Sequence, residues 1–377
     1  MKKVMFLILT MCYIAICNAQ ISQDIVQSID TLFNLTNNQS PGYIVGVVEK
    51  DRCIFSKAYG QANLENEISI NENTSFNIAS LSKQITGAAI AILTLEDKLD
   101  LNDYVSDYLL GFPFVKDSVK NKHFIYMISG INDYRYNDRL NGTDWSSLNY
   151  FNIDTAIIAS YNSRELMYQP GSQWSYSNIN YMLLAKIVEE VSETSFAKFV
   201  KQNIFNPLEM NSSIVNDDIF EIMPNRAYGY NYRTDDETNW LIESGYLKEK
   251  GGGLLQIHRN SPHYGGSGIY TTLNDWVRWI SNFYSKKIGG QEFYDLMHKT
   301  MKFEHEKSND AFGLVIDKHK EKDVVWYIGG DWGCSSFMIR FPKTETLIIC
   351  FSNIGTGNAR SKVLSIYDIL IENGVLE

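Results

Sequence analysis

The chain has 377 residues, with 34 basic and 44 acidic side chains and a formal net charge of -10 at pH 7. This acidic balance excludes nucleic acid as an expected partner, because nucleic-acid binding needs a basic face. The length allows one large domain, or two intertwined ones, with an extensive buried core.

The first 19 residues have the pattern of a secretory signal peptide. Lys2 and Lys3 precede an apolar run, and small residues lead up to Ala19, which predicts cleavage after that alanine. A lipoprotein signal at Cys17 is less favoured because a bulky isoleucine precedes it. We therefore expect an exported protein, periplasmic or secreted, with 358 residues (377 - 19) and a net charge of -12 (-10 - 2). No later run reaches the roughly 18 apolar residues of a membrane span, so no transmembrane segment is expected in the mature chain.

The cysteines and histidines predict neither a disulfide framework nor a metal site. After the signal peptide Cys53, Cys334 and Cys350 remain, an odd number at wide spacing, unlike the regular spacing of disulfide-rich domains. His258 and His263 have no third ligand nearby in the sequence, whereas zinc requires at least three protein ligands. We expect no cofactor.

Strand patterns lie near both ends of the chain, and helix patterns lie between them. Residues 43–60 predict two strands joined by the charged turn EKDR. Apolar residues at helical spacing follow from about Ser80. The later elements are a helix ending near 192, a helix over 195–204, short strands at 323–330, 334–342 and 345–354, and a last helix over 359–373.

This order predicts a mixed α/β (α+β) fold, in which an antiparallel sheet built from both termini carries an inserted, mainly helical domain. Within residues 20–377 we expect a sheet subdomain at about 20–79 and 225–377. The helical subdomain is expected at about 80–224, so that its start coincides with the first candidate motif.

That motif is a Ser-x-x-Lys pair in FNIASLSKQITGAAI, residues 76–90. Residues three apart share a helix face, so Ser80 can contact Lys83 while Ser82 points elsewhere. A helix N-terminus also offers backbone N–H groups and a partial positive charge to a developing anion. Ser80 is therefore the candidate nucleophile. Lys83 is its candidate base, provided that burial or a nearby cation lowers the pKa of the lysine.

Two such patterns are weak without context. Ser-x-x-Lys occurs again at Ser195 and Lys198, where a capped helix start and a solvated lysine explain it. Tyr-x-Asn occurs at Tyr176 and Asn178, in a loop that enters a helix, and a second match begins at Tyr150. The Tyr176 phenol could relay a proton, or its ring could pack between the subdomains.

A glycine-rich strand edge, WYIGGDWGCSSF at 326–337, supplies the third candidate feature. Gly329, Gly330 and Gly333 would let a substrate approach the backbone closely. The N–H of Gly330 could join that of Ser80 as an oxyanion hole. A glycine-rich β-bulge is the alternative interpretation.

Five motifs follow one another along the chain: FNIASLSKQITG, MISGINDY, PGSQWSYSNINYMLLAKIVEEVS, GGSGIYTTLNDW and YIGGDWGCSSF. Their order resembles the serine β-lactamase and penicillin-binding-protein superfamily, closest to the branch of class C β-lactamases, D-aminopeptidases and esterases. The likeness runs from about residue 25 to 370. It implies a sheet with helices on both faces, a mainly helical domain, and a site between them.

The resemblance also implies roles for single residues. Ser80 matches the serine that is acylated, and Lys83 matches its paired lysine. Tyr176 matches the tyrosine of Tyr-x-Asn, and Asn178 matches the amide that holds the lysine and the substrate. Gly330 matches the second donor of the oxyanion hole.

One motif departs from the family pattern. The usual Lys-Thr-Gly or His-x-Gly reads Tyr327-Ile328-Gly329 here, without the cation and hydroxyl that help to hold a substrate carboxylate. Some esterases of the family also carry an aromatic residue at this position. Arg360, in GNARSKV, matches in place an arginine near the class C site and could anchor a carboxylate instead.

The sequence therefore predicts an exported serine hydrolase that cleaves a small-molecule ester, peptide or β-lactam through an acyl-serine intermediate. A true class C-type β-lactamase or D-Ala-D-Ala carboxypeptidase, anchored through Arg360, is one alternative. A catalytically inactive binding or sensor module of the same fold is the other. Whether Lys83 or Tyr176 is the general base stays open, because coupled groups share their protons; the oligomeric state stays open too.

Overall fold

The computed structural model describes residues 21–37, 39–50, 52–109, 111, 118–133, 152–155, 157, 165–233, 242–243, 253–257, 263–303 and 306–376. The predicted signal peptide, Tyr150 and His258 lie outside them.

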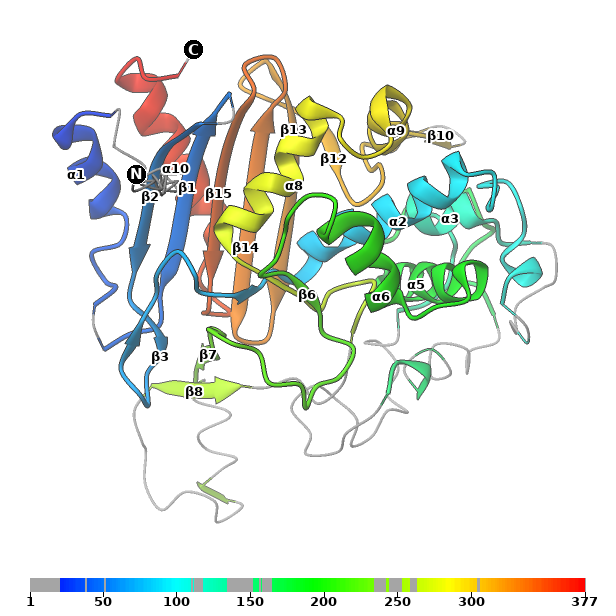
Figure 1. The fold of residues 1–377 in the computed structure, drawn as a ribbon, viewed down its shortest axis with the longest axis horizontal. Coiled ribbons are helices and arrows are strands. Elements are labelled where there is room, and N and C mark those ends of the chain that lie inside the picture. The colour runs from blue at the N-terminus through cyan, green and yellow to red at the C-terminus, as the bar shows by residue number, and fades with distance from the viewer. Residues whose placement is uncertain are drawn as a thin grey trace, which may run out of the picture.

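The centre of the molecule is a six-stranded antiparallel sheet built from both ends of the chain, in the order β12-β13-β14-β15-β1-β2 (Figure 1). β1 pairs directly with β15, from Tyr43 opposite Ser352 to Glu49 opposite Thr346. The first and last strands of the chain thus lie side by side. The strands are β1 (Tyr43–Glu49), β2 (Arg52–Tyr59), β12 (Val315–His319), β13 (Lys322–Asp331), β14 (Cys334–Phe341) and β15 (Thr346–Ser352).

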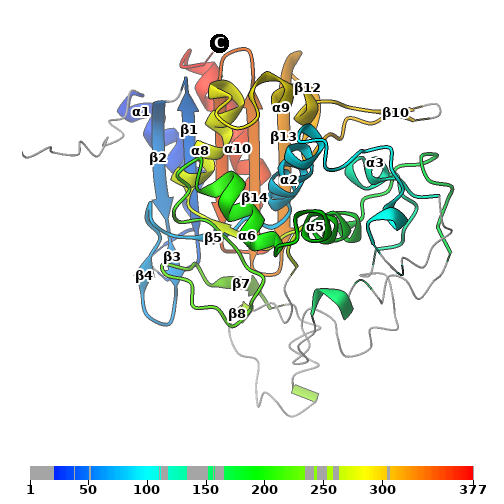
Figure 2. The same ribbon diagram turned by 45° about the vertical axis from the view of Figure 1, so that its right-hand side comes forward.

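Alternation along these strands gives the sheet two apolar faces. On β15, Ile349 belongs to the core under α8 and the first turn of α2, whereas its neighbour Ile348 belongs to the core under α1 and α10. α8 crosses the front of the sheet in Figure 1, and Figure 2 shows α2 on the same side. These helices are α1 (Gln23–Thr31), α2 (Lys83–Leu95), α8 (Leu273–Ser285) and α10 (Ala359–Glu372).

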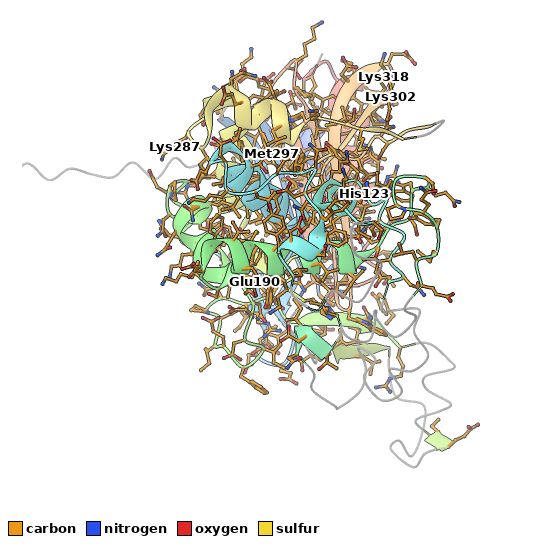
Figure 3. The ribbon with its side chains drawn as sticks, turned by 90° about the vertical axis from the view of Figure 1, so that its right-hand side faces the viewer. His123, Glu190, Lys287, Met297, Lys302 and Lys318 are labelled. Atoms are coloured by element: carbon orange, nitrogen blue, oxygen red, sulfur yellow. The ribbon has the colours of Figure 1, made fainter. Side chains whose placement is uncertain are left out.

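Helix α2 is the centre of the second, helical region. Every residue from 81 to 93 is buried. The residues from 87 to 93 are small or apolar, and the buried polar side chains of Lys83, Gln84 and Thr86 have hydrogen-bond partners. Figure 3 looks onto this region, where Glu190 marks α5 and His123 marks α3. The remaining helices are α3 (Asn121–Ile125), α5 (Asn178–Ser192), α6 (Phe196–Val200) and α9 (Gly290–Met297), with two 3-10 helices, η1 (Ala79–Ser82) and η2 (Val105–Asp107), and a π-helix, η4 (Lys201–Phe205).

Short strand pairs border the two regions. The sheet β5-β9-β6 joins residues next to the Ser-x-x-Lys pair to the segment after Gly268, and β7 and β8 form a two-stranded antiparallel sheet. The short strands are β3 (Gln61–Asn63), β4 (Ile68–Ser69), β5 (Phe76–Asn77), β6 (Ile214–Val215), β7 (Gly229–Tyr232), β8 (Leu254–Ile257), β9 (Ile269–Thr271), β10 (Lys302–Phe303) and β11 (Glu306–Lys307). The predicted fold class, an antiparallel sheet flanked by helices with a helical insertion, is confirmed.

Two details differ from the sequence-based expectation. The α-helix expected from Ser80 begins at Lys83, and Ser80 lies in the preceding 3-10 helix. The helix expected over 195–204 consists of α6 and a following π-helix. No helix in the described part of the chain has the length and apolar character needed to cross a membrane.

Candidate active site

A strained turn places Ser80 at the start of the helical region. Ala79 has φ 48°, in the left-handed range that costs an L-residue free energy. The Asn77 side chain accepts a hydrogen bond from the Ala79 N–H at 2.9 Å, an Asx turn that supports this conformation. The chain therefore turns sharply just before Ser80, and the Ser80 side chain borders a cleft of about 890 Å³.

Lys83 lies directly behind Ser80 and is completely buried. Its Nζ donates to Ser80 Oγ at 3.0 Å, to Asn178 Oδ1 at 2.9 Å and to the Gly266 carbonyl at 2.5 Å. In its protonated form Lys83 has three N–H donors, so these acceptors match the donor set of that form and offset the cost of removing it from water. The Tyr176 ring, 5.0 Å from Nζ, adds a cation–π contact.

Tyr176 and Asn178 reach the same point from the start of α5. Tyr176 Oη lies 2.7 Å from Ser80 Oγ, and it donates to Asn178 Oδ1 at 3.3 Å. Asp133 Oδ2 accepts from both the backbone N–H and the side-chain amide of Asn178, each at 2.9 Å. Because Asp133 binds the NH₂ group, the amide oxygen is turned toward Lys83 and Tyr176.

This arrangement gives Ser80 Oγ two neighbours that can take up or return a proton, Tyr176 Oη and Lys83 Nζ. All three groups lie within hydrogen-bond distance as one connected network. A proton can therefore pass between these groups without a large movement of any side chain. Chemically, the network suits activation of a serine hydroxyl for attack on a carbonyl.

The glycines of β13 face this network across the cleft. β12 pairs with β13 only as far as Trp326, and beyond that point η1 packs against the strand. A Cβ at Gly329 would lie 2.5 Å from the Ile78 carbonyl oxygen and 2.2 Å from Ser336 Oγ, whereas a Cβ at Gly330 would meet nothing within 4 Å. Gly329 therefore permits close packing next to the Ile78–Ala79 turn, and Gly330 borders the open cleft.

The two remaining predicted residues, Tyr327 and Arg360, lie on opposite sides of β13. Tyr327 lines the cleft and is 4% exposed, and burial raises the pKa of its hydroxyl well above the ordinary value, so the side chain is neutral. Arg360 is exposed, and its guanidinium lies 5.3 Å from the Trp326 ring centre. Arg360 borders the cleft but stacks on the face of the strand that points away from Tyr327.

Two groups that take part in this network had no predicted role. Asp133, in MISGINDY, fixes the Asn178 amide, and the Gly266 carbonyl, in GGSG, accepts from Lys83. Both belong to motifs that carried the family resemblance, but neither residue has a spacing that predicts a contact with α2 or α5. Only the fold brings them to the site.

The other serines and histidines have different surroundings. Ser82 Oγ accepts from the Ile269 N–H at 3.1 Å, which agrees with the expectation that it points away from Lys83. Ser195 caps α6, accepting from the Lys198 N–H at 3.3 Å. His263 borders the cleft, and no group of three His, Cys, Asp or Glu side chains suited to a metal occurs in the described ranges.

A family model described as Beta-lactamase matches residues 23–372. Penicillin-binding protein 4* of Bacillus subtilis (strain 168) is 28% identical over 318 residues, which are 80% of this chain and 65% of that protein. Protein flp of Staphylococcus aureus (strain COL) is 29% identical over 352 residues, 89% of this chain and 65% of that protein. The chain thus spans slightly less than two thirds of the length of these curated relatives.

Solved structures share the fold at lower identity. The octameric penicillin-binding protein homologue from Pyrococcus abyssi has a TM-score of 0.74 and 20% identity, covering 93% of this chain and 77% of that one. The D-amino acid amidase from Ochrobactrum anthropi SV3 has a TM-score of 0.74 and 16% identity, covering 93% and 99%. EstCE1, a hydrolase with promiscuous acyltransferase activity, has a TM-score of 0.70 and 19% identity, and the match covers 91% of this chain and 97% of that one.

These neighbours confirm the predicted fold class, and the family match confirms the predicted resemblance. With the Beta-lactamase model matching nearly the whole described chain, this protein belongs to the beta-lactamase family of serine hydrolases and penicillin-binding proteins.

Proposed function

We propose that this protein is a serine hydrolase that cleaves an ester or amide through an acyl-Ser80 intermediate. The observation that carries the proposal is the contact of Ser80 Oγ with both Tyr176 Oη, at 2.7 Å, and buried Lys83 Nζ, at 3.0 Å. A serine hydroxyl is a weak nucleophile unless an adjacent base removes its proton. A network of this kind is not needed for packing alone.

In the first half of the reaction, Ser80 Oγ attacks the substrate carbonyl carbon, and its proton passes to whichever member of the Lys83 and Tyr176 pair lacks one. The same proton then goes to the departing alcohol or amine, which leaves the acyl group on Ser80. In the second half, water attacks the acyl carbonyl carbon and gives a proton to the same pair. That proton passes to Ser80 Oγ as the bond between Oγ and the acyl carbon breaks, which releases the carboxylic acid and restores Ser80. Asn178 keeps both proton carriers in place.

The negative charge on the tetrahedral oxygen needs fixed donors. The backbone N–H groups of Ser80 and Gly330 are the proposed donors, since both residues border the cleft. Gly329 of β13 packs closely on Ile78 and Ala79. This packing keeps β13 next to Ser80 and so limits changes in the distance between the two donors. Removing one such donor typically lowers kcat about a hundred- to a thousandfold.

Tyr327 is the basis for the expected preference for substrates without a carboxylate. A lysine or histidine at this position would place positive charge beside the site and favour substrates with a carboxylate, whereas a neutral tyrosine offers at most one neutral hydrogen bond. Arg360 stacks on Trp326 at the rim and supplies the cation for the alternative, a β-lactamase or D-Ala-D-Ala carboxypeptidase. We expect small esters without a carboxylate to be hydrolysed faster than penicillins, cephalosporins or D-Ala-D-Ala peptides.

Labelling the protein with a fluorophosphonate and, separately, with a fluorescent penicillin tests this proposal. Mass spectrometry of the labelled peptide should place the fluorophosphonate on Ser80, and Ser80→Ala should abolish the label. Equally strong penicillin labelling would favour the β-lactamase or peptidase alternative. Absence of both labels, with ester hydrolysis undetectable, would favour an inactive binding module.

We further propose that the protein acts outside the cytoplasm, because residues 1–19 combine a basic start, an apolar run and small residues before Gln20. Expression of the full chain in a bacterial host, followed by N-terminal analysis of the exported fraction, should find Gln20 as the first residue. Retention of Met1 in the cytoplasmic fraction alone would contradict export.

A further inference from the structure

Asp310 brings a carboxylate into the cleft that contains Ser80. It lies just before β12 and forms an antiparallel bridge with Val315, which in turn pairs with Trp326 of β13. Asp310 is therefore held beside the part of β13 that faces the nucleophile. The proposed hydrolysis gives this carboxylate no role.

The segment that carries Asp310 is fixed against the hydrogen-bonded network. Gly313 has φ 71°, and a Cβ there would lie 2.4 Å from the backbone carbon of Lys83, so the segment packs directly on the first turn of α2. The Ala311 carbonyl accepts from Tyr181 Oη at 3.5 Å. Asp310 thus has a rigid position relative to Lys83, as a specificity-determining group requires.

The surroundings of Asp310 are poor in water. Burial raises the pKa of the Asp310 carboxyl to about 6, although hydrogen bonds from Ser308 and Trp174 act in the opposite direction and lower it. The titratable groups that face Asp310 are the hydroxyls of Tyr181, from α5, and Tyr327, from β13. A carboxylate kept in a partly dehydrated cleft destabilises the folded protein, and such groups are concentrated at functional sites.

Aromatic rings line the same cleft. Trp174 is 45% exposed, so its ring is accessible to a ligand. The faces of such rings attract cations, most strongly when water is excluded. The aromatic side chains of the cleft are Trp174, Tyr176, Trp326, Tyr327 and Trp332.

Two further charged residues border the cleft, Asp331 and Arg360. Asp331 accepts from Ser267 Oγ at 3.3 Å and from the Trp332 N–H at 2.8 Å, and Arg360 stacks on the Trp326 ring. Asp310 accepts hydrogen bonds from Ser308 Oγ, at 3.3 Å, and from Trp174, and its charge interacts with the Tyr327 hydroxyl.

We propose that Asp310 selects ester or amide substrates that carry a positively charged amine or quaternary ammonium group near the scissile bond. The proposal rests on acyl-serine hydrolysis at Ser80. The carboxylate binds the cation, and the aromatic walls enclose it. Where a family member with a lysine in the third motif places a cation, this cleft has a neutral tyrosine and a carboxylate, so its preference for substrate charge is reversed.

Two substrate pairs test the proposal, one for each side of the scissile bond. Butyrylcholine and 3,3-dimethylbutyl butyrate have the same shape and differ in the quaternary charge on the alcohol. Phenylalanine methyl ester and methyl 3-phenylpropanoate differ in the ammonium on the acyl group, at a pH where the amine is protonated. We expect kcat/KM of the wild-type protein to favour the cationic member of at least one pair by about tenfold or more, because a cation partly shielded from water is attracted by a nearby carboxylate and by aromatic ring faces.

Asp310→Asn should reduce that ratio by about tenfold, because it removes the charge and keeps the shape. Asp323→Asn, an equal charge change at the exposed opposite end of β13, is the matched control and should leave the ratio unchanged. A wild-type ratio near one in both pairs overturns the proposal without any variant. A folded Asp310→Asn protein that keeps the wild-type ratio, including one that loses activity equally toward both members, also overturns it. Ser80-dependent hydrolysis of the two neutral esters tests the proposed function separately.

Discussion

The chain contains Ser-x-x-Lys twice, at Ser80–Lys83 and Ser195–Lys198, and the two copies have opposite surroundings. Lys83 is completely buried and donates to three acceptors, whereas Lys198 is exposed. Ser80 Oγ contacts a phenol and an ammonium, whereas Ser195 Oγ accepts a backbone N–H at a helix start. The same spacing therefore belongs to a buried hydrogen-bonded network in one place and to a helix cap in the other.

The difference comes from contacts made at long range along the chain. The acceptors of Lys83 are 95 and 183 residues away, besides Ser80 itself, while the Ser195 contact spans three residues. Local spacing sets which side chains share a side of a helix, but burial and partners from distant segments decide their chemistry. Mutations can test this difference between the two copies, and the largest effect is expected at Ser80.

Ser80→Ala should remove acyl-enzyme formation and lower kcat for a neutral ester by roughly ten-thousandfold or more, as loss of a nucleophile does. Ser195→Ala should leave kcat within about a few-fold, because it lies outside the cleft. Burst kinetics and intact-protein mass spectrometry measure both. An acyl group on Ser195, or full activity of Ser80→Ala, would show that the two copies have been assigned the wrong way round.

Tyr176→Phe keeps the ring beside Lys83 and removes only the hydroxyl that contacts Ser80. Loss of one proton-transfer group should lower kcat about a hundred- to ten-thousandfold. The melting temperature should stay close to that of the wild type, because the ring still packs against the helical core. A normal rate at normal stability would leave proton transfer to Lys83 alone.

Two substitutions at Gly330 test whether its backbone N–H is a donor of the oxyanion hole. Gly330→Ala adds a Cβ that meets nothing within 4 Å, so the melting temperature should not change. Gly330→Pro also removes the N–H and should lower kcat a further hundred- to thousandfold relative to the alanine variant. Equal activity of the two folded variants would exclude the Gly330 N–H from the oxyanion hole.

The sequence was sufficient to predict the sheet and the helix after Ser80. Short β-branched and aromatic runs between turn residues, and apolar residues at helical spacing, are local signals, and they agree with the observed strands and with α2. The helix start was placed three residues early, because the Asx turn at Asn77 and the left-handed Ala79 precede a 3-10 helix that has no distinct pattern.

Three groups near Ser80 could not be predicted from the sequence, because only tertiary contacts bring them there. The Gly266 carbonyl reaches Lys83 through the turn of GGSG, where a Cβ at Gly265 would lie 2.3 Å from the Tyr181 carbonyl oxygen. The role of Asp133 depends on the position of α5. The raised pKa of Asp310 depends on burial. None of these has a period or spacing by which it could be recognised in one sequence.

The smallest predicted effect concerns the second Ser-x-x-Lys copy and measures stability rather than rate. Ser195 Oγ caps α6 through the Lys198 N–H at 3.3 Å, a long hydrogen bond, so Ser195→Ala should lower the free energy of unfolding by about 0.5–1 kcal/mol. Ser195→Asp should restore most of that loss, because a carboxylate caps equally well and suits the positive end of the helix. Urea unfolding of the three proteins gives the comparison, with ester hydrolysis measured in parallel. If the Ser195 hydroxyl took part in the reaction, the aspartate variant would be as stable as the wild type but as inactive as Ser80→Ala.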